Sequence, residues 1–151
     1  MSTATALPDP AFSADRLLGG RKVLHRQPRT PLEWVDVIRQ GISSATVDVL
    51  AKTLHLSQNE LASALAIPER TLVRRKREGT LSSEESAKVV RLARVVERAE
   101  QVFEDLVPAL DWLKAPNAAL GGDTPLSLLD TDIGAQTVMD TLGRIEHGVY
   151  G

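Results

Sequence analysis

The sequence predicts an all-α protein, in which an N-terminal helical domain with a helix-turn-helix precedes a small C-terminal helical domain. Of the 151 residues, 17 are Ala and 21 are Leu, which favour helices, whereas only five are Phe, Trp or Tyr, which favour strands. Three capping boxes, in which a Ser or Thr precedes a Glu by three residues, mark helix starts at Thr30, Ser57 and Ser82. No segment has the pattern of a strand that pairs with another, so a sheet is not expected.

Residues 1–29 are expected to form an irregular arm, because several prolines and the Gly19-Gly20 pair interrupt any regular pattern. The first helix then begins at Pro31, after its Thr30 cap, and ends at Gly41. A second helix begins near Ser43 or Ser44, with apolar residues at the i, i+3, i+4, i+7 spacing of a helix face. These residues are Val47, Leu50, Ala51 and Leu54.

A helix-turn-helix is expected over residues 57–77. A third helix begins after Ser57, a break follows at Ala66-Ile67-Pro68, and a fourth helix ends before Gly79. The short gap between the two helices fits the turn of this motif, with Ala in place of the usual Gly. The buried contacts of the motif are expected from Leu61, Ala62, Leu65, Ile67 and Leu72.

The longest expected helix spans residues 83–107, is ended or kinked by Pro108, and completes a DNA-binding domain over residues 30–107. Its apolar side chains recur at alternating spacings of three and four, which is typical of a buried helix face and also of a dimer seam. Both interpretations stay open, because one end of the stripe can cover the core while the other contacts a second copy. The stripe comprises Val89, Leu92, Val96, Ala99, Phe103 and Leu106.

Residues 108–151 are expected to form the small second domain. A short helix is followed by turn residues over 116–125, and a last helix begins near Asp130 or Thr131 and ends at Gly148.

The charge is divided along the chain. The formal net charge is −2, but residues 1–98 carry a net +5 and residues 99–151 a net −7. Such an asymmetry indicates two partners of different kinds. The basic part suits a nucleic acid, whereas the acidic part does not.

The residue types argue against an enzyme. Cys is absent, which removes disulfides, thiolate metal sites and a Cys nucleophile, and the three His residues lie far apart. We therefore expect no catalytic residue, no metal and no cofactor. The sequence has no apolar run of about 20 residues, which a membrane span needs. Its first ten residues also lack the features of a signal peptide, so a cytoplasmic protein without membrane contact is expected.

Candidate DNA-binding residues lie on the fourth helix. Arg70, Arg74 and Arg77 are spaced at i, i+4 and i+7, which places them within about 60° of one another around the helix. Arginines on such a face can contact guanine edges or phosphates in a major groove. The expected DNA contacts are Arg70, Thr71, Arg74, Arg75, Lys76 and Arg77.

An ordinary solvated face remains the alternative. Arg75 lies three residues after Leu72, where such motifs usually bury an apolar side chain, and this departure favours phosphate contacts over base contacts. Further basic residues on the long helix are interpreted as its polar side rather than as a second phosphate contact. They are Lys88, Arg91, Arg94 and Arg98.

The C-terminal part carries a series of motifs. The most specific is Leu142-Gly143-Arg144-Ile145-Glu146-His147-Gly148-Val149-Tyr150. It follows Trp112-Leu113, Pro116-Asn117, Ala119-Leu120-Gly121-Gly122, Pro125-Leu126, Leu128-Leu129-Asp130-Thr131 and Gly134. With the Xre-type helix-turn-helix in front, about residues 50–151 resemble the Xre/MbcA/ParS antitoxins of type II toxin–antitoxin operons.

This resemblance implies that the domain over residues 108–151 binds a toxin. The partner in this family is typically a RES-domain toxin, which resembles ADP-ribosyltransferases and destroys cellular NAD. The antitoxin hinders access to the toxin active site through its C-terminal domain, and the complex represses its own operon through the N-terminal half. The candidate toxin-binding residues are Asn117, Leu120, Gly121, Gly122, Arg144, Glu146, His147, Tyr150 and Gly151.

A homodimer within a larger complex with toxin and operator DNA is also expected, because repressors of this kind bind two half-sites. Two other functions remain as alternatives. One is a free-standing helix-turn-helix transcriptional regulator, whose C-terminal domain senses a ligand or dimerises. The other is a protein-interaction module that no longer contacts DNA.

Overall fold

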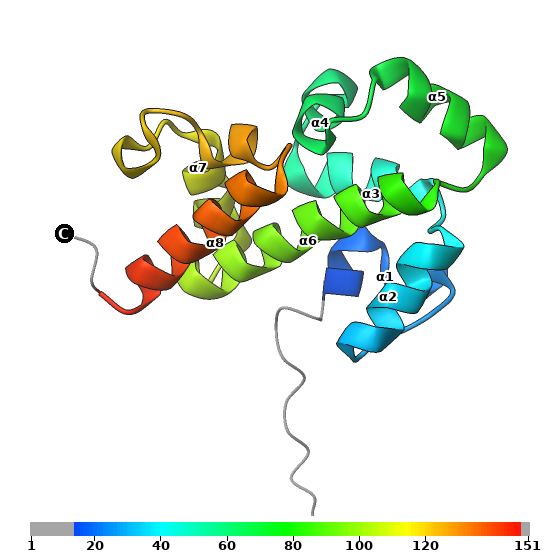
Figure 1. Cartoon of the computed structure of the whole chain (residues 1–151), viewed down its shortest axis with the longest axis horizontal. Coiled ribbons are helices and arrows are strands. Elements are labelled where there is room, and N and C mark those ends of the chain that lie inside the picture. Colours follow the sequence, from blue (N-terminus) through cyan, green and yellow to red (C-terminus); the bar gives the residue numbers. More distant parts are fainter. Residues whose placement is uncertain (1–13, 149–151) are drawn as a thin grey trace, which may run out of the picture.

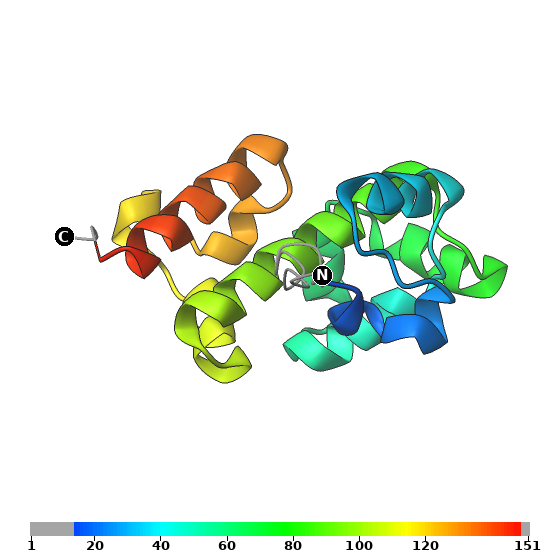
Figure 2. The same cartoon turned by 90° about the horizontal axis from the view of Figure 1, so that it is seen from below.

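A computed structural model of the chain describes residues 14–148, and these residues fold into helices around one long central helix (Figures 1 and 2). The all-α prediction is confirmed, because the described part contains no strand and only one isolated antiparallel bridge, between Ser43 and Thr80. None of the described helices is long and apolar enough to cross a membrane. The central helix is α6, Ser83–Phe103. In both views it runs between the N-terminal helices and the C-terminal ones.

The expectation of an irregular arm is wrong for residues 14–24. They form a 3-10 helix, η2 (Ala14–Leu18), and a short α1 (Gly20–Leu24), and both pack on the core. Ala14, Leu17 and Leu18 are buried, and η2 contacts α6 and α3. The apolar pair at 17–18 therefore belongs to the core, and the glycines that follow form the turn into α1. Residues 1–13 lie outside the described part.

The next four helices begin close to their predicted starts, and two of them begin at capping boxes. The Thr30–Glu33 and Ser57–Glu60 capping boxes are both formed, and Ser44 precedes the helix between them. The four helices are α2 (Pro31–Gln40), α3 (Ala45–Leu54), α4 (Gln58–Leu65) and α5 (Glu69–Glu78).

The long helix is shorter than expected. The third capping box, Ser82–Glu85, starts α6 as predicted, but α6 ends at Phe103 because Glu104 adopts a left-handed conformation with φ 65°. A separate helix, α7 (Leu106–Lys114), follows, and Pro108 lies in its first turn, where a missing N–H is tolerated. The turn is packed by Phe103 against Trp112, with ring centroids 5.7 Å apart.

The apolar stripe of α6 is used inside the chain. Val89, Leu92, Val96 and Ala99 are at most 1% exposed. These side chains therefore form the core that joins α6 to its neighbours, and the interpretation as a dimer seam is wrong for this part of the stripe.

The C-terminal region packs on the second half of α6. Two short 3-10 helices, η3 (Ala118–Leu120) and η4 (Pro125–Leu128), connect α7 to the last helix, α8 (Asp132–Glu146). Both α7 and α8 contact α6, and η4 contacts α7, α8 and α4. Gly134 lets α8 approach η4, because a Cβ at this position would lie 1.9 Å from the Leu128 carbonyl oxygen.

Candidate functional site

The turn between α4 and α5 fixes the direction of α5. Ala66 ends α4 in a left-handed conformation with φ 55°, and Ile67 is buried directly after it. Lys88 of α6 donates a hydrogen bond of 3.0 Å to the Ala66 carbonyl oxygen, which satisfies the C-terminal end of α4. The residue that replaces Gly in this turn therefore adopts the conformation that Gly would adopt.

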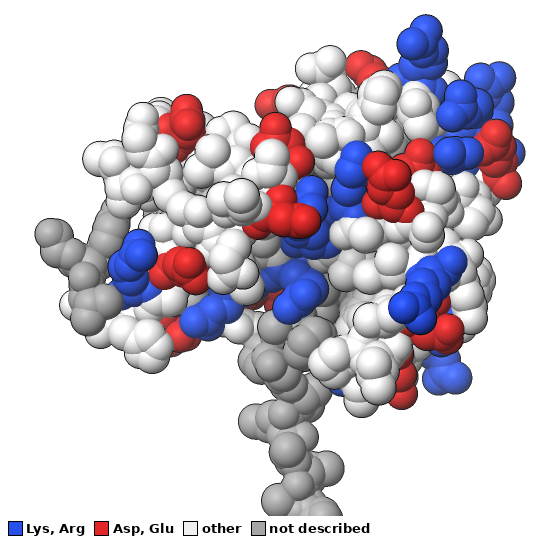
Figure 3. Space-filling view, in the orientation of Figure 1, with Lys and Arg blue, Asp and Glu red and all other residues white. Residues whose placement is uncertain are grey.

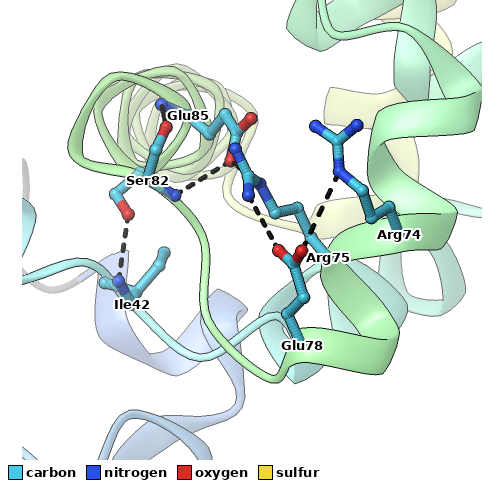
Figure 4. A network of polar contacts seen from close by, with 7 residues as sticks. Ile42, Arg74, Arg75, Glu78, Ser82 and Glu85 are labelled. Atoms are coloured by element: carbon cyan, nitrogen blue, oxygen red, sulfur yellow. Dashed lines mark hydrogen bonds and ion pairs between the residues drawn. The ribbon is translucent and has the colours of Figure 1, made fainter.

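The inner face of α5 is held mainly by charge. Within α5, all of whose residues are described, Leu72 is the only buried side chain. Next to it, Arg75 donates hydrogen bonds of 2.8 Å to Glu78 and to Glu85 of α6 (Figure 4). Glu85 also accepts the Ser82 N–H of the capping box, at 2.9 Å. Arg75 thus connects α5 to the start of α6.

The charge of Glu85 depends on these bonds. Burial by itself raises the pKa of Glu85, but hydrogen bonds from the Arg75 side chain and the Ser82 backbone outweigh it and hold that pKa below its ordinary value. The bonds from Arg75 to Glu85 and Glu78 in turn raise the pKa of Arg75. Both groups stay charged at neutral pH, so the connection between α5 and α6 is ionic there.

Lys76 has a similar position on the other flank of α5. Its Nζ lies 2.7 Å from Asp48 of α3 and 3.1 Å from the side-chain oxygen of Gln58 in α4. Arg75 and Lys76 were both expected to contact DNA, and in the structure both side chains pair with other helices of the protein while Lys76 stays exposed. The partners on other helices lie 10 to 28 residues away in the sequence, so their spacing gives no local signal. Only the contact of Arg75 with Glu78 is local, at a spacing of three residues.

The outer face of α5 carries the remaining candidates. Arg70, Arg74 and Arg77 are exposed, and Thr71 is half-buried at the edge of a groove between α5 and α6. Arg74 is 54% exposed and its Nε lies 4.0 Å from Glu78. Figure 3 shows Lys and Arg side chains gathered over α5 at one corner of the molecule. We call Arg70, Arg74 and Arg77 the arginine face.

The basic residues of α6 behave differently from those of the arginine face. Arg91 is paired with Asp132, and Arg98 donates two hydrogen bonds, of 3.0 Å and 2.6 Å, to the Glu146 carboxylate. Both acidic partners lie on α8. The net positive charge of the first 98 residues is therefore partly used to hold the acidic C-terminal helix.

The expected toxin-binding residues of the segment between α7 and α8 divide into two groups. Asn117 and Leu120 are each 8% exposed, and the Asn117 side chain accepts the Ala119 N–H at 2.9 Å, so both shape the loop from inside. Gly121 and Gly122 are exposed and have φ values of 71° and 89°. These positive φ values favour Gly, so the two residues form a tight turn at the surface.

The expected toxin-binding residues at the end of the chain also divide. Arg144 and His147 are exposed, whereas Glu146 is bound by Arg98. The hydrogen bond from Arg98 holds the pKa of Glu146 below its ordinary value. Tyr150 and Gly151 lie outside the described residues.

Comparison with known proteins identifies both halves of this arrangement. Residues 33–94 match the antitoxin Xre-like helix-turn-helix domain, and residues 98–148 match the antitoxin Xre/MbcA/ParS C-terminal toxin-binding domain. An Antitoxin Xre of Yersinia enterocolitica is 37% identical over 118 residues, which cover 77% of this chain and 80% of the relative. The chain belongs to the Xre antitoxin family.

Two further relatives support this assignment. An Antitoxin Xre of Photorhabdus laumondii is 33% identical over 115 residues, covering 75% of this chain and 78% of the relative. A protein of Sphingobium sp. named Prs ADP-ribosylating antitoxin is 30% identical over 139 residues, covering 85% of this chain and 86% of the relative. The match to the Xre helix-turn-helix begins at residue 33, earlier than the resemblance recognised in the sequence, and so includes α2.

The boundary between the two matched domains lies inside α6. Residue 94 ends the first match and residue 98 begins the second, and both belong to one continuous helix. In this Xre antitoxin, the helix-turn-helix and the toxin-binding domain are thus joined by a helix rather than by a flexible linker.

Proposed function

We propose that this antitoxin inhibits a RES-type, NAD-degrading toxin through its C-terminal domain and represses its own operon through the arginine face of α5. One observation carries the proposal. The arginine face points to solvent, while Arg75 and Lys76 hold α5 against the body of the protein. A helix held in this way is suited to enter a major groove without rearrangement.

The contacts on DNA are proposed to be Arg70, Thr71, Arg74 and Arg77. Binding to two half-sites requires a homodimer, and its interface lies away from the buried stripe of α6. A cytoplasmic location follows from the DNA target.

Salt dependence tests the DNA contact directly. In Arg74→Ala, operator affinity is expected to fall and the salt slope to decrease by about 1, if the contact is to phosphate. Affinity is measured at several salt concentrations without toxin, with Arg144→Glu as the matched control. An unchanged slope and affinity for Arg74→Ala would remove Arg74 from the DNA site.

The toxin contact is proposed to use the exposed turn at Gly121-Gly122 together with Arg144 and His147 on the end of α8. The acidic C-terminal part complements a toxin pocket that binds an anionic cofactor, because such pockets are basic. Glu146 is left out of the contact surface because Arg98 already binds it.

Co-expression with the product of the adjacent gene tests the inhibition. The neighbour is expected to be toxic alone, to lower cellular NAD, and to copurify with the antitoxin in a fixed ratio. Arg144→Glu is expected to reduce protection, whereas Arg74→Ala is expected to protect as well as the wild type. If no neighbour copurifies and operator binding remains, the chain is a free-standing regulator.

A second class of toxin is favoured by the Sphingobium relative, whose name refers to ADP-ribosylation of Prs. Such a toxin would transfer ADP-ribose to a protein, so cells that express the toxin without the antitoxin would contain modified Prs. A mass measurement of Prs together with an NAD assay in the same cells distinguishes the two classes.

A further inference from the structure

A cleft separates α2 from α8, and α6 forms its floor. It encloses about 430 Å³ and is lined by Ile38 of α2, by Val90, Arg91 and Arg94 of α6, and by Ala135 and Met139 of α8. Figure 3 shows Lys and Arg atoms in the hollow between the two lobes of the molecule. The cleft thus combines apolar walls with two guanidinium groups one helical turn apart. It lies apart from α5 and from the end of α8.

Arg91 lines this cleft and is incompletely satisfied. Its Nη1 is paired with Asp132, but its Nε is buried and has no hydrogen-bond partner among the described residues. Most buried polar groups in proteins have a partner, and a buried donor of a charged group is especially unfavourable when it has none. The part of the Arg91 guanidinium that a ligand in the cleft can reach is therefore the Nη1 side, which Asp132 now occupies.

The ion pair with Asp132 indicates that Arg91 binds an anion at this position. Asp132 is the first residue of α8, and its side chain is 91% exposed while that of Arg91 is 23% exposed. An ion pair with one fully solvated partner contributes little and is easily exchanged. A stronger anion can therefore displace the Asp132 carboxylate from Arg91.

We infer that this cleft binds a small phosphorylated ligand about the size of a mononucleotide. The phosphate takes the place of the Asp132 carboxylate and accepts from Arg91, with Arg94 at the next turn of the floor. The non-phosphate part of the ligand lies between the apolar walls. A phosphate monoester is favoured over a carboxylate because it offers three acceptor oxygens and two charges to neighbouring guanidinium groups. The volume lies within the ordinary range of ligand pockets, about 300–1,000 Å³.

The test is a titration of the ¹⁵N-labelled full chain with adenosine monophosphate at low salt, followed by amide chemical shifts. Saturable shifts are expected over residues 90–95 and 135–139. Inorganic phosphate is expected to shift the same amides with weaker affinity, and adenosine without phosphate to shift none. Shifts confined to α5, or equal affinities for phosphate and adenosine monophosphate, would contradict the inference.

Substitutions of the two partners in the Arg91–Asp132 ion pair are expected to change the ligand affinity in opposite directions. Arg91→Gln is expected to weaken binding about tenfold, which corresponds to about 1.4 kcal/mol. Asp132→Asn removes the competing carboxylate and is expected to strengthen binding severalfold. Because a loss of folding cannot strengthen binding, the second variant keeps the test decisive even if the first is destabilised. Arg70→Gln, on the arginine face, is the control and should leave the affinity unchanged.

An acidic peptide is the competing occupant. If a Glu-rich peptide gives saturable cleft shifts that Asp132→Asn strengthens, while adenosine monophosphate gives none, the cleft is a protein-docking surface and the inference is wrong.

Discussion

At one end of α6, helix α5 buries only Leu72 of its ten fully described residues, whereas near the other end α8 buries Ala135, Val138, Thr141 and Leu142. Helix α5 is instead held by Arg75 and Lys76, which pair with α6 and α3. The ion pairs of α8, from Arg91 and Arg98, lie at the rim of an apolar contact. The helix that carries the arginine face is therefore docked by charge, and α8 is docked by packing.

This difference suits the proposed partners. A polar attachment holds α5 in place while its arginine face stays exposed for DNA, and a packed attachment keeps the end of α8 in place during toxin binding. The difference also predicts which substitutions destabilise each helix. Added side-chain volume should destabilise α8, and the loss of a charged side chain should destabilise α5.

The largest effect is expected from Gly134→Ala in α8. A Cβ there would lie 1.9 Å from the Leu128 carbonyl oxygen, which belongs to backbone and cannot turn aside. We expect a loss of about 3 kcal/mol in the free energy of unfolding, at the upper end for overpacking, measured by urea denaturation. Gly143→Ala in the same helix is the control, since its Cβ would meet nothing within 4 Å. It should gain up to about 1 kcal/mol from helix propensity. Equal effects of the two substitutions would show that α8 is not docked by close packing.

A smaller and more local effect is expected from Arg75→Gln in α5. The substitution removes the bonds to Glu78 and Glu85 and leaves Leu72 in place. Amide hydrogen exchange should become severalfold faster in α5 and stay unchanged in α8, because unsupported segments open locally. Arg74→Gln is the matched control, since Arg74 is 54% exposed and lies 4.0 Å from Glu78. If the two variants exchange alike, charge does not hold α5.

Acidification should likewise weaken the attachment of α5 before that of α8. The pKa of Glu85 is lowered in the folded protein, so its contribution is present above the unfolded value of about 4.3 and is lost as the pH falls through the lower folded pKa. Protection of α5 amides should therefore fall below about pH 4.3, before that of the α8 amides around buried Val138, which lie away from the Arg98–Glu146 pair and its lowered carboxyl pKa. The dependence should be weaker in Glu85→Gln and unchanged in Glu84→Gln, whose side chain is 84% exposed. A parallel loss in both helices would contradict the comparison.

The sequence predicted the helix starts well, because a capping box is a local signal within four residues. All three boxes, at Thr30, Ser57 and Ser82, are formed. What it missed depends on distant contacts or on single backbone angles. The docking of residues 14–24 depends on α3 and α6, and the end of α6 depends on a left-handed Glu104, a residue type that gives no such signal.

The candidate site shows the same difference between local signals, which are predictable, and distant contacts, which are not. The helical spacing of Arg70, Arg74 and Arg77 was sufficient to place them on one exposed face. The roles of Arg75 and Glu146 were not predictable, since their partners Glu85 and Arg98 lie 10 and 48 residues away. The residue type alone does not reveal whether a charged side chain beside a functional face contacts a partner or the protein itself.

The smallest effect is expected from Ala66→Gly, in the turn that leads into α5. Ala66 has φ 55°, and a left-handed conformation costs a residue with a Cβ roughly 1–2 kcal/mol that Gly does not lose. Part of this gain is offset by the greater freedom of Gly in the unfolded chain, so the net increase in stability should be at most about 1 kcal/mol. The hydrogen bond from Lys88 goes to the backbone oxygen of residue 66 and is retained.

Ser63→Gly, at an exposed position inside α4, is the matched control for thermal unfolding. It should lower the stability by about 0.5 kcal/mol, because Gly is unfavourable within a helix. Opposite signs for two glycine substitutions three residues apart would show that the turn itself is strained. Two decreases would show that the Ala66 conformation carries no such strain.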